Sequence, residues 1–106
     1  MSEKKKLAYE VKTTDQGLLE YVIRDGNEVV LRLPFHKTPV QVAALAERTV
    51  KRLLRAYEVG FEANRFYSPK CDNPHKKDNP YDAAFHIMWN KGWEDSESLY
   101  GDSSSL

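Results

Sequence analysis

The chain has 106 residues, of which 30% are charged and 41% are hydrophobic, with sixteen Lys and Arg balanced by sixteen Asp and Glu. This length suits one small domain, and the zero formal charge disfavours a general polyanion binder. No apolar stretch approaches the ~20 residues that span a bilayer, and a single cysteine, Cys71, excludes an intrachain disulfide. We therefore expect one cytoplasmic domain over residues 1–106, without membrane contact and with flexible ends at residues 1–6 and 102–106.

Charge is unevenly distributed along the chain. Residues 1–56 hold eleven basic and seven acidic side chains, a net +4, whereas residues 57–106 hold five and nine, a net −4. The two halves either neutralise each other or present a basic surface that steers a partner.

The first third of the chain has the pattern of a β-meander. Within residues 7–33, three segments alternate apolar and polar side chains with the period of half-buried strands. Gly17 lies in the first turn, where a positive φ is accessible to it, and Asp25-Gly26 is a strong hairpin signal. Pro34 should end the third strand, because proline has no N–H to donate to a ladder.

A long helix is predicted from Pro39 to about Asn64. Thr38 is a suitable N-cap, Pro39 suits the first helical position, and Gln41 stands where its side chain can return the capping hydrogen bond. Apolar residues follow at three- and four-residue steps and give a wide stripe that can cover the meander. They are Val42, Leu45, Ala46, Val50, Leu53, Leu54, Tyr57 and Phe61.

Residues 66–78, with two prolines, are predicted to form a connecting loop. A second helix is then predicted over about residues 80–98, with Asn79 as its cap and Asp82 in its positive first turn. The complete pattern predicts an α+β fold, a three-stranded antiparallel meander followed by two helices.

The long helix carries a basic stripe on the side opposite its apolar residues, made of Arg48, Lys51, Arg52 and Arg55. Two interpretations stay open. Pairs from Glu47 to Lys51 and from Arg55 to Glu58 would make it an ordinary solvated face, whereas unpaired cations in this arrangement can follow a phosphate backbone.

No catalytic or metal-binding constellation emerges. Cys71, His75 and His86 include zinc-ligating residue types but lack the paired spacing of a zinc site. Cys71, His36 and Asp78 could be combined into a nucleophilic arrangement only by residue type. We therefore expect a protein that is not an enzyme and that uses no metal or cofactor.

Gly60 and Gly92 each fall inside a predicted helix, where glycine costs ~1 kcal/mol relative to alanine. A close crossing of the two helices would compensate for this cost, each glycine leaving room for an aromatic ring of the other helix. The alternative is that each glycine marks a helix end. The neighbouring aromatic residues are Tyr57 and Phe61 for one glycine and Trp89 and Trp93 for the other.

Three segments, in order, resemble the ribosome modulation factor family. They are Arg55-Ala56-Tyr57-Glu58-Val59-Gly60-Phe61-Glu62-Ala63, Asn79-Pro80-Tyr81 and Trp89-Asn90-Lys91-Gly92-Trp93. The resemblance covers about residues 48–97 and implies a helix pair whose crossing involves Tyr57, Gly60, Tyr81, Trp89, Gly92 and Trp93. Ala56, Ala63 and Asn79 replace two glycines and a cysteine of the family.

The resemblance implies a small regulatory protein that associates with the ribosome or its RNA, since members of this family bind the small ribosomal subunit and promote ribosome dimerisation. Among the four stripe residues, only Arg55 belongs to a matched motif. The alternative is a protein-binding module, such as a phage-encoded inhibitor or adaptor of a host protein, using the meander edge or rings of the second helix. Homodimerisation through an edge strand also stays open.

Overall fold

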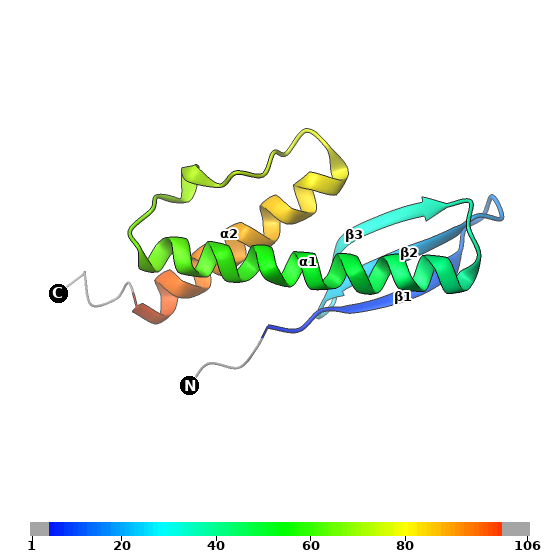
Figure 1. Ribbon diagram of the computed structural model, residues 1–106, viewed down its shortest axis with the longest axis horizontal. Coiled ribbons are helices and arrows are strands. Elements are labelled where there is room, and N and C mark those ends of the chain that lie inside the picture. Colours follow the sequence, from blue (N-terminus) through cyan, green and yellow to red (C-terminus); the bar gives the residue numbers. More distant parts are fainter. Residues whose placement is uncertain (1–4, 101–106) are drawn as a thin grey trace. The chain divides into compact units, whose positions relative to one another are not determined.

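The computed structural model describes residues 5–100. Its elements follow the order β1 (Ala8–Thr13), β2 (Leu19–Asp25), β3 (Glu28–Phe35), α1 (Pro39–Arg65), the 3-10 turn η1 (Lys70–Asp72) and α2 (Pro80–Tyr100). The predicted α+β fold, an antiparallel meander followed by two helices, is confirmed (Figure 1). The ends predicted to be flexible lie outside the described residues except for Lys5 and Lys6, and Lys5 forms an ion pair of 2.8 Å with Asp25.

The chain divides into two compact units, and the boundary between Leu54 and Arg55 falls inside α1. The first unit contains the sheet and the first half of α1. The second contains the remainder of α1, the loop and α2. The expectation of one domain over residues 1–106 stays a prediction beside this division into two units.

In the first unit, the strands pair in the order β1-β2-β3, all antiparallel. Gly17 and Gly26 adopt positive φ values of 81° and 64° in the two turns, as their positions predict. Pro34 does not end β3, which continues to Phe35 and pairs Pro34 with Glu20. That prediction was wrong because β3 is an edge strand, where a residue without an N–H can be accommodated.

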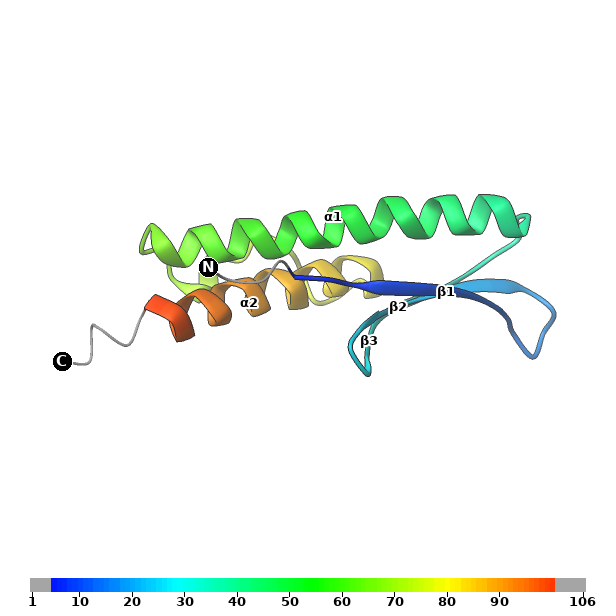
Figure 2. The ribbon, with the colours of Figure 1, turned by 90° about the horizontal axis from the view of Figure 1, so that it is seen from below.

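The first half of α1 packs on one face of this sheet (Figure 2). Thr38 and Gln41 form the predicted capping box, with each side chain accepting the other residue's backbone N–H, at 3.1 and 3.3 Å. Tyr21 is buried, and its hydroxyl lies 3.3 Å from the hydroxyl of Thr49, a buried polar residue that the apolar stripe does not include. Tyr9 donates a hydrogen bond of 3.0 Å to Glu47.

In the second unit, α2 lies alongside the second half of α1 and runs in the same direction (Figures 1 and 2). Because the helices are parallel, residues 66–79 must return along the length of α2, a helix of 21 residues and ~30 Å. The 14 residues between the helices are enough for this, since an extended chain advances ~3.3 Å per residue. The predicted loop thus carries the chain from the end of α1 back to the start of α2.

Asn79 caps α2 as predicted, and its side-chain oxygen accepts the backbone N–H of Tyr81 at 2.8 Å. One face of α2 is buried. Its residues are Ala84, Phe85, Met88, Trp89, Gly92 and Ser96.

Candidate functional site

The basic stripe lies on α1 and all four of its side chains are exposed: Arg48, Lys51, Arg52 and Arg55. Helical geometry, with about 100° between successive residues, places them within roughly 100° of one another. The buried residues Val42, Ala46 and Leu53 point to the opposite side of the helix. Arg48, Lys51 and Arg52 are therefore exposed cations on the side of α1 away from its buried residues.

Most of the stripe is not neutralised by acidic neighbours. Arg55 forms the predicted pair with Glu58, at 3.8 Å and between well-exposed groups. The predicted pair from Glu47 to Lys51 does not form, and the Glu47 carboxylate instead accepts a hydrogen bond from Tyr9. Within residues 5–100, no carboxylate pairs with Arg48, Lys51 or Arg52.

The acidic residues near the end of α2 are engaged inside the second unit. Tyr57 donates a hydrogen bond to Asp95, and Lys70 pairs with Glu94. The side-chain amide of Asn64 donates to Glu97 at 2.9 Å. The acidic end of α2 thus serves to join the helices and the loop of its own unit.

Gly60 and Gly92 bring the backbones of α1 and α2 into direct contact. A Cβ added at Gly60 would overlap the carbonyl oxygen of Trp89 and lie 2.8 Å from its carbonyl carbon. A Cβ added at Gly92 would overlap the carbonyl oxygen of Tyr57 and lie 2.9 Å from its carbonyl carbon and from the amide nitrogen of Phe61. The glycines therefore make room for backbone, whereas we expected them to make room for aromatic rings.

The aromatic residues expected at the crossing have separate roles. Trp89 is buried, and its backbone contacts Gly60. The indole N–H of Trp93 donates a hydrogen bond of 2.8 Å to the carbonyl of Ser68 in the loop. Tyr81 lies two helical turns before Trp89, and its ring packs against Phe85 with centroids 5.1 Å apart.

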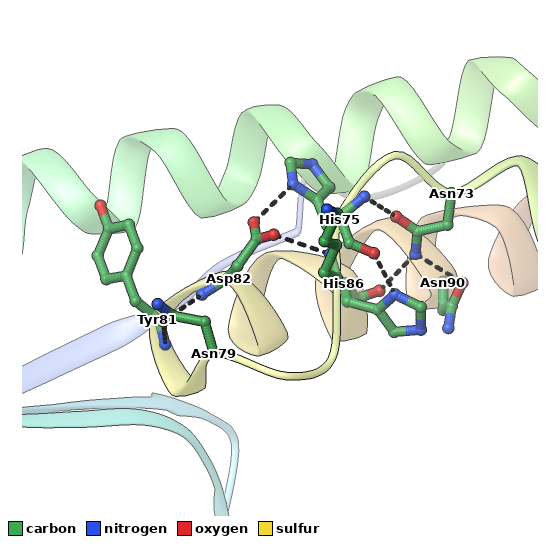
Figure 3. A network of polar contacts seen from close by, with 8 residues as sticks. Asn73, His75, Asn79, Tyr81, Asp82, His86 and Asn90 are labelled. Carbon is green, nitrogen blue, oxygen red and sulfur yellow. Dashed lines mark hydrogen bonds and ion pairs between the residues drawn. The ribbon is translucent and has the colours of Figure 1, made fainter.

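A polar network ties the returning loop to α2 (Figure 3). The Asn73 side-chain amide donates to the His86 carbonyl and to the Asn90 side chain, both at 2.9 Å. The His86 ring lies 2.8 Å from the carbonyl of His75. The Asn73 side chain thus bonds to the backbone of α2 and the His86 side chain contacts the backbone of the loop, across 13 and 11 positions of the sequence.

Asp82 completes this network at the start of α2. Its carboxylate accepts the backbone N–H of Lys76 at 2.8 Å and lies 3.1 Å from the His75 ring. The Lys76 hydrogen bond, followed by the His75 interaction, lowers the pKa of Asp82 from its ordinary value. From the sequence we assigned Asp82 only to the positive helix end, and its role in holding the loop was missed.

The histidine and cysteine residues do not form a metal centre in the part of the chain that the structure describes. Among residues 5–100, no three His, Cys, Asp or Glu side chains are arranged to hold an ion. Cys71 is exposed in η1. His75 and His86 each use ring atom Nδ1 in the loop network.

Two exposed aromatic residues at the end of α1 were not anticipated. Phe66 is 77% exposed and Tyr67 is 94% exposed. The N–H of Tyr67 bonds to the Asn64 carbonyl and that of Ser68 to the Ala63 carbonyl, which is the Schellman pattern of a helix C-terminus. Tyr67 takes the left-handed position with φ of 65°, where glycine is usual.

Comparisons with protein-family models, with curated proteins and with solved structures find no match to this chain. Within residues 5–100, neither helix has the length and apolar character that crossing a membrane requires.

Proposed function

We propose that this protein is a non-catalytic regulatory binding protein that contacts ribosomal RNA through the basic stripe on α1. One observation carries the proposal: Arg48, Lys51 and Arg52 are exposed on one helical face, and no acidic side chain within residues 5–100 pairs with them. Similarity of the helix-pair motifs to ribosome modulation factor supplies the choice of RNA as the partner.

The spacing of the stripe suits a phosphate backbone. Arg48 and Arg55 are two helical turns apart, about 10 Å along the axis. Successive phosphates of a nucleic-acid strand recur at several ångströms, so neighbouring cations on one helical face can contact neighbouring phosphates. Such contacts carry no base specificity, and we expect affinity to depend on charge and on RNA shape.

The first experiment measures binding of the full chain to a fluorescently labelled RNA hairpin across a range of salt concentrations. Replacing Arg48, Lys51 and Arg52 by glutamine should weaken binding. It should also reduce the slope of log affinity against log salt by about 2 to 3, roughly one for each lost phosphate contact.

The control replaces three other exposed cations, Lys37, Lys76 and Lys77, by glutamine. This variant has the same net charge as the stripe variant, so it separates the stripe from general electrostatics. The proposal requires the control to keep the wild-type salt slope. Equal weakening by both variants would contradict it.

Cosedimentation with purified small ribosomal subunits tests the biological partner. The wild-type chain should sediment with the subunits and the stripe variant should remain in the supernatant. If both sediment equally, the stripe is not the ribosomal contact. If neither sediments and neither binds the hairpin, the protein-binding alternative replaces the RNA proposal.

A further inference from the structure

The outer edge of β1 has the features of a strand that can accept a partner. The sheet order β1-β2-β3 leaves β1 at one edge, and within residues 5–100 no fourth strand pairs with it. Five of its six residues are exposed, and Val11 is half-buried. The strand contains neither glycine nor proline, so every one of its residues retains a backbone N–H.

The opposite edge of the sheet is less suited to pairing. β3 contains Pro34, which lacks an N–H, and its pairing with β2 is irregular at Ile23 and Arg24. Proline and irregular pairing both protect edge strands from association. The two edges of the sheet therefore differ, and β1 is the one that can extend the ladder.

The charges on β1 select among possible partners. Glu10 and Lys12 lie on the face away from α1. There they form an ion pair with each other at 3.2 Å, and Glu10 also pairs with Arg24 at 3.0 Å. Charged residues on an edge strand oppose pairing with an arbitrary strand. They favour a strand that places an acidic residue opposite Lys12 and a basic residue opposite Glu10.

A second copy of β1 meets this requirement in one register. In a two-fold antiparallel pair, an axis at Val11 places Glu10 of each copy opposite Lys12 of the other. An axis at Glu10 would oppose two glutamates, and an axis at Lys12 would oppose two lysines. An axis at Tyr9 would place Lys12 opposite Lys6, so among these four axes only the one at Val11 is complementary in charge.

We propose that two copies of this chain associate by antiparallel pairing of their β1 strands about a two-fold axis at Val11, forming a six-stranded sheet. Directly opposed residues share a face in an antiparallel ladder. Tyr9, whose hydroxyl contacts Glu47 of α1, then lies opposite Thr13 on the helix-covered face, and the two Val11 side chains meet between them. Pairing covers residues 9–13, so the association is weak and depends on concentration.

The same symmetry has a consequence for the helices. A two-fold axis perpendicular to the sheet keeps the first halves of both α1 helices on one face of the six-stranded sheet. Arg48, Lys51 and Arg52 of both copies then point to the same side. The association itself does not depend on RNA binding, and its tests use protein alone.

Sedimentation velocity of the full chain tests the association directly. The wild-type chain should shift from monomer to dimer between ~10 µM and ~1 mM protein. A chain that remains monomeric throughout this range would overturn the proposal.

A charge exchange tests the register. The variants Glu10→Lys and Lys12→Glu should each lose self-association, since each opposes like charges twice across the axis. An equimolar mixture should recover dimers, because a mixed pair places the two basic side chains of one variant opposite the two acidic side chains of the other. If Glu10→Lys fails to fold through loss of the Arg24 contact, Lys12→Glu alone still tests self-association, since it leaves that contact intact. Unchanged self-association of a folded variant would refute the register.

Cysteine crosslinking locates the axis. In a Cys71→Ser background, Val11→Cys should give a disulfide-linked dimer under mild oxidation, because the two positions are opposed. Tyr9→Cys in the same background should remain uncrosslinked, since position 9 faces position 13. Crosslinking at position 9 and not at position 11 would place the axis elsewhere and contradict the proposal.

Discussion

Gly60 and Gly92 each face the backbone carbonyl of the residue three positions before the other glycine, which is Trp89 for Gly60 and Tyr57 for Gly92. Each helix thus supplies an aromatic residue and a glycine that are neighbours on one helical face. Because the contact joins backbone to backbone, no change of side-chain rotamer can relieve an added atom. The crossing is therefore intolerant of any side chain at either glycine.

Gly60→Ala should lower the free energy of unfolding by about 3 kcal/mol, because the added methyl group forces the two helices apart. This loss outweighs the ~1 kcal/mol that alanine gains over glycine in a helix. Urea unfolding followed by tryptophan fluorescence measures the change. Glu62→Ala, at an exposed position of the same helix, is the control. Equal stability of the two variants would show that the close approach is not maintained in solution.

Asp82 should make stability depend on pH in the acid range. Its folded-state pKa is lowered, first by the Lys76 backbone hydrogen bond and then by His75. The ionised carboxylate therefore stabilises the fold above the ordinary aspartate pKa, and this contribution is lost as the pH falls through the lowered value. Asp82→Asn should be less stable than wild type at pH 6, and the difference should shrink below about pH 4.

Urea midpoints at about pH 6 and about pH 3, on either side of the ordinary aspartate pKa, provide the measurement for Asp82→Asn. Asp78→Asn, which removes an exposed carboxylate from the same loop, should retain the wild-type response to pH. A difference between wild type and Asp82→Asn that is constant with pH would show that the charge of Asp82 has no stabilising role.

Tyr67→Gly should raise the free energy of unfolding by about 1 kcal/mol, because the left-handed conformation is strained for a residue with a Cβ. The side chain is 94% exposed, so little packing is lost. Tyr67→Ala is the matched control, since alanine keeps the Cβ and the strain. Thermal unfolding of the three proteins measures the difference, and a similar gain for both variants would point to the ring instead of the backbone.

Ser96→Ala should stabilise the second unit. The Ser96 side chain is fully buried, and within the part of the chain that the structure describes its hydroxyl has no hydrogen-bond partner. Removing a buried unsatisfied hydroxyl is expected to add about 1 kcal/mol beyond the helix-propensity effect. Ser98→Ala, exposed on the same helix, measures that propensity effect by itself. Chemical denaturation of both variants should show the larger gain at position 96.

The features predicted from sequence are those whose partners lie close along the chain. Thr38 and Gln41 are three positions apart, and the hairpin at Gly26 depends on two residues between alternating segments. Gly60 and Gly92 also predicted a close approach of the two helices, because a glycine inside a helix is costly unless such a contact compensates for it. The prediction that Pro34 ends the third strand was wrong, because a proline is accommodated in a strand at the edge of a sheet. Whether a strand lies at an edge depends on the order of all the strands in the sheet.

The features that were missed depend on where distant segments meet. Glu47 was expected to pair with Lys51 four positions later, but it accepts a hydrogen bond from Tyr9, 38 positions away. The contacts of Asn73 and Asp82 arise because the loop returns along a parallel helix, and residue types in the loop do not predict that path. Tyr67 was missed because tyrosine is not a residue that favours the left-handed region.

The continuity of α1 across the boundary between Leu54 and Arg55 affects how this protein can be dissected. Separate units are commonly joined by an exposed, irregular segment that proteases cut and that tolerates insertions. Here the joining peptide bonds lie within hydrogen-bonded helical turns. Limited proteolysis should therefore spare the boundary, and a truncation at Leu54 would leave each fragment with an uncapped helix end. Functional tests of either half are best made by substitutions in the intact chain.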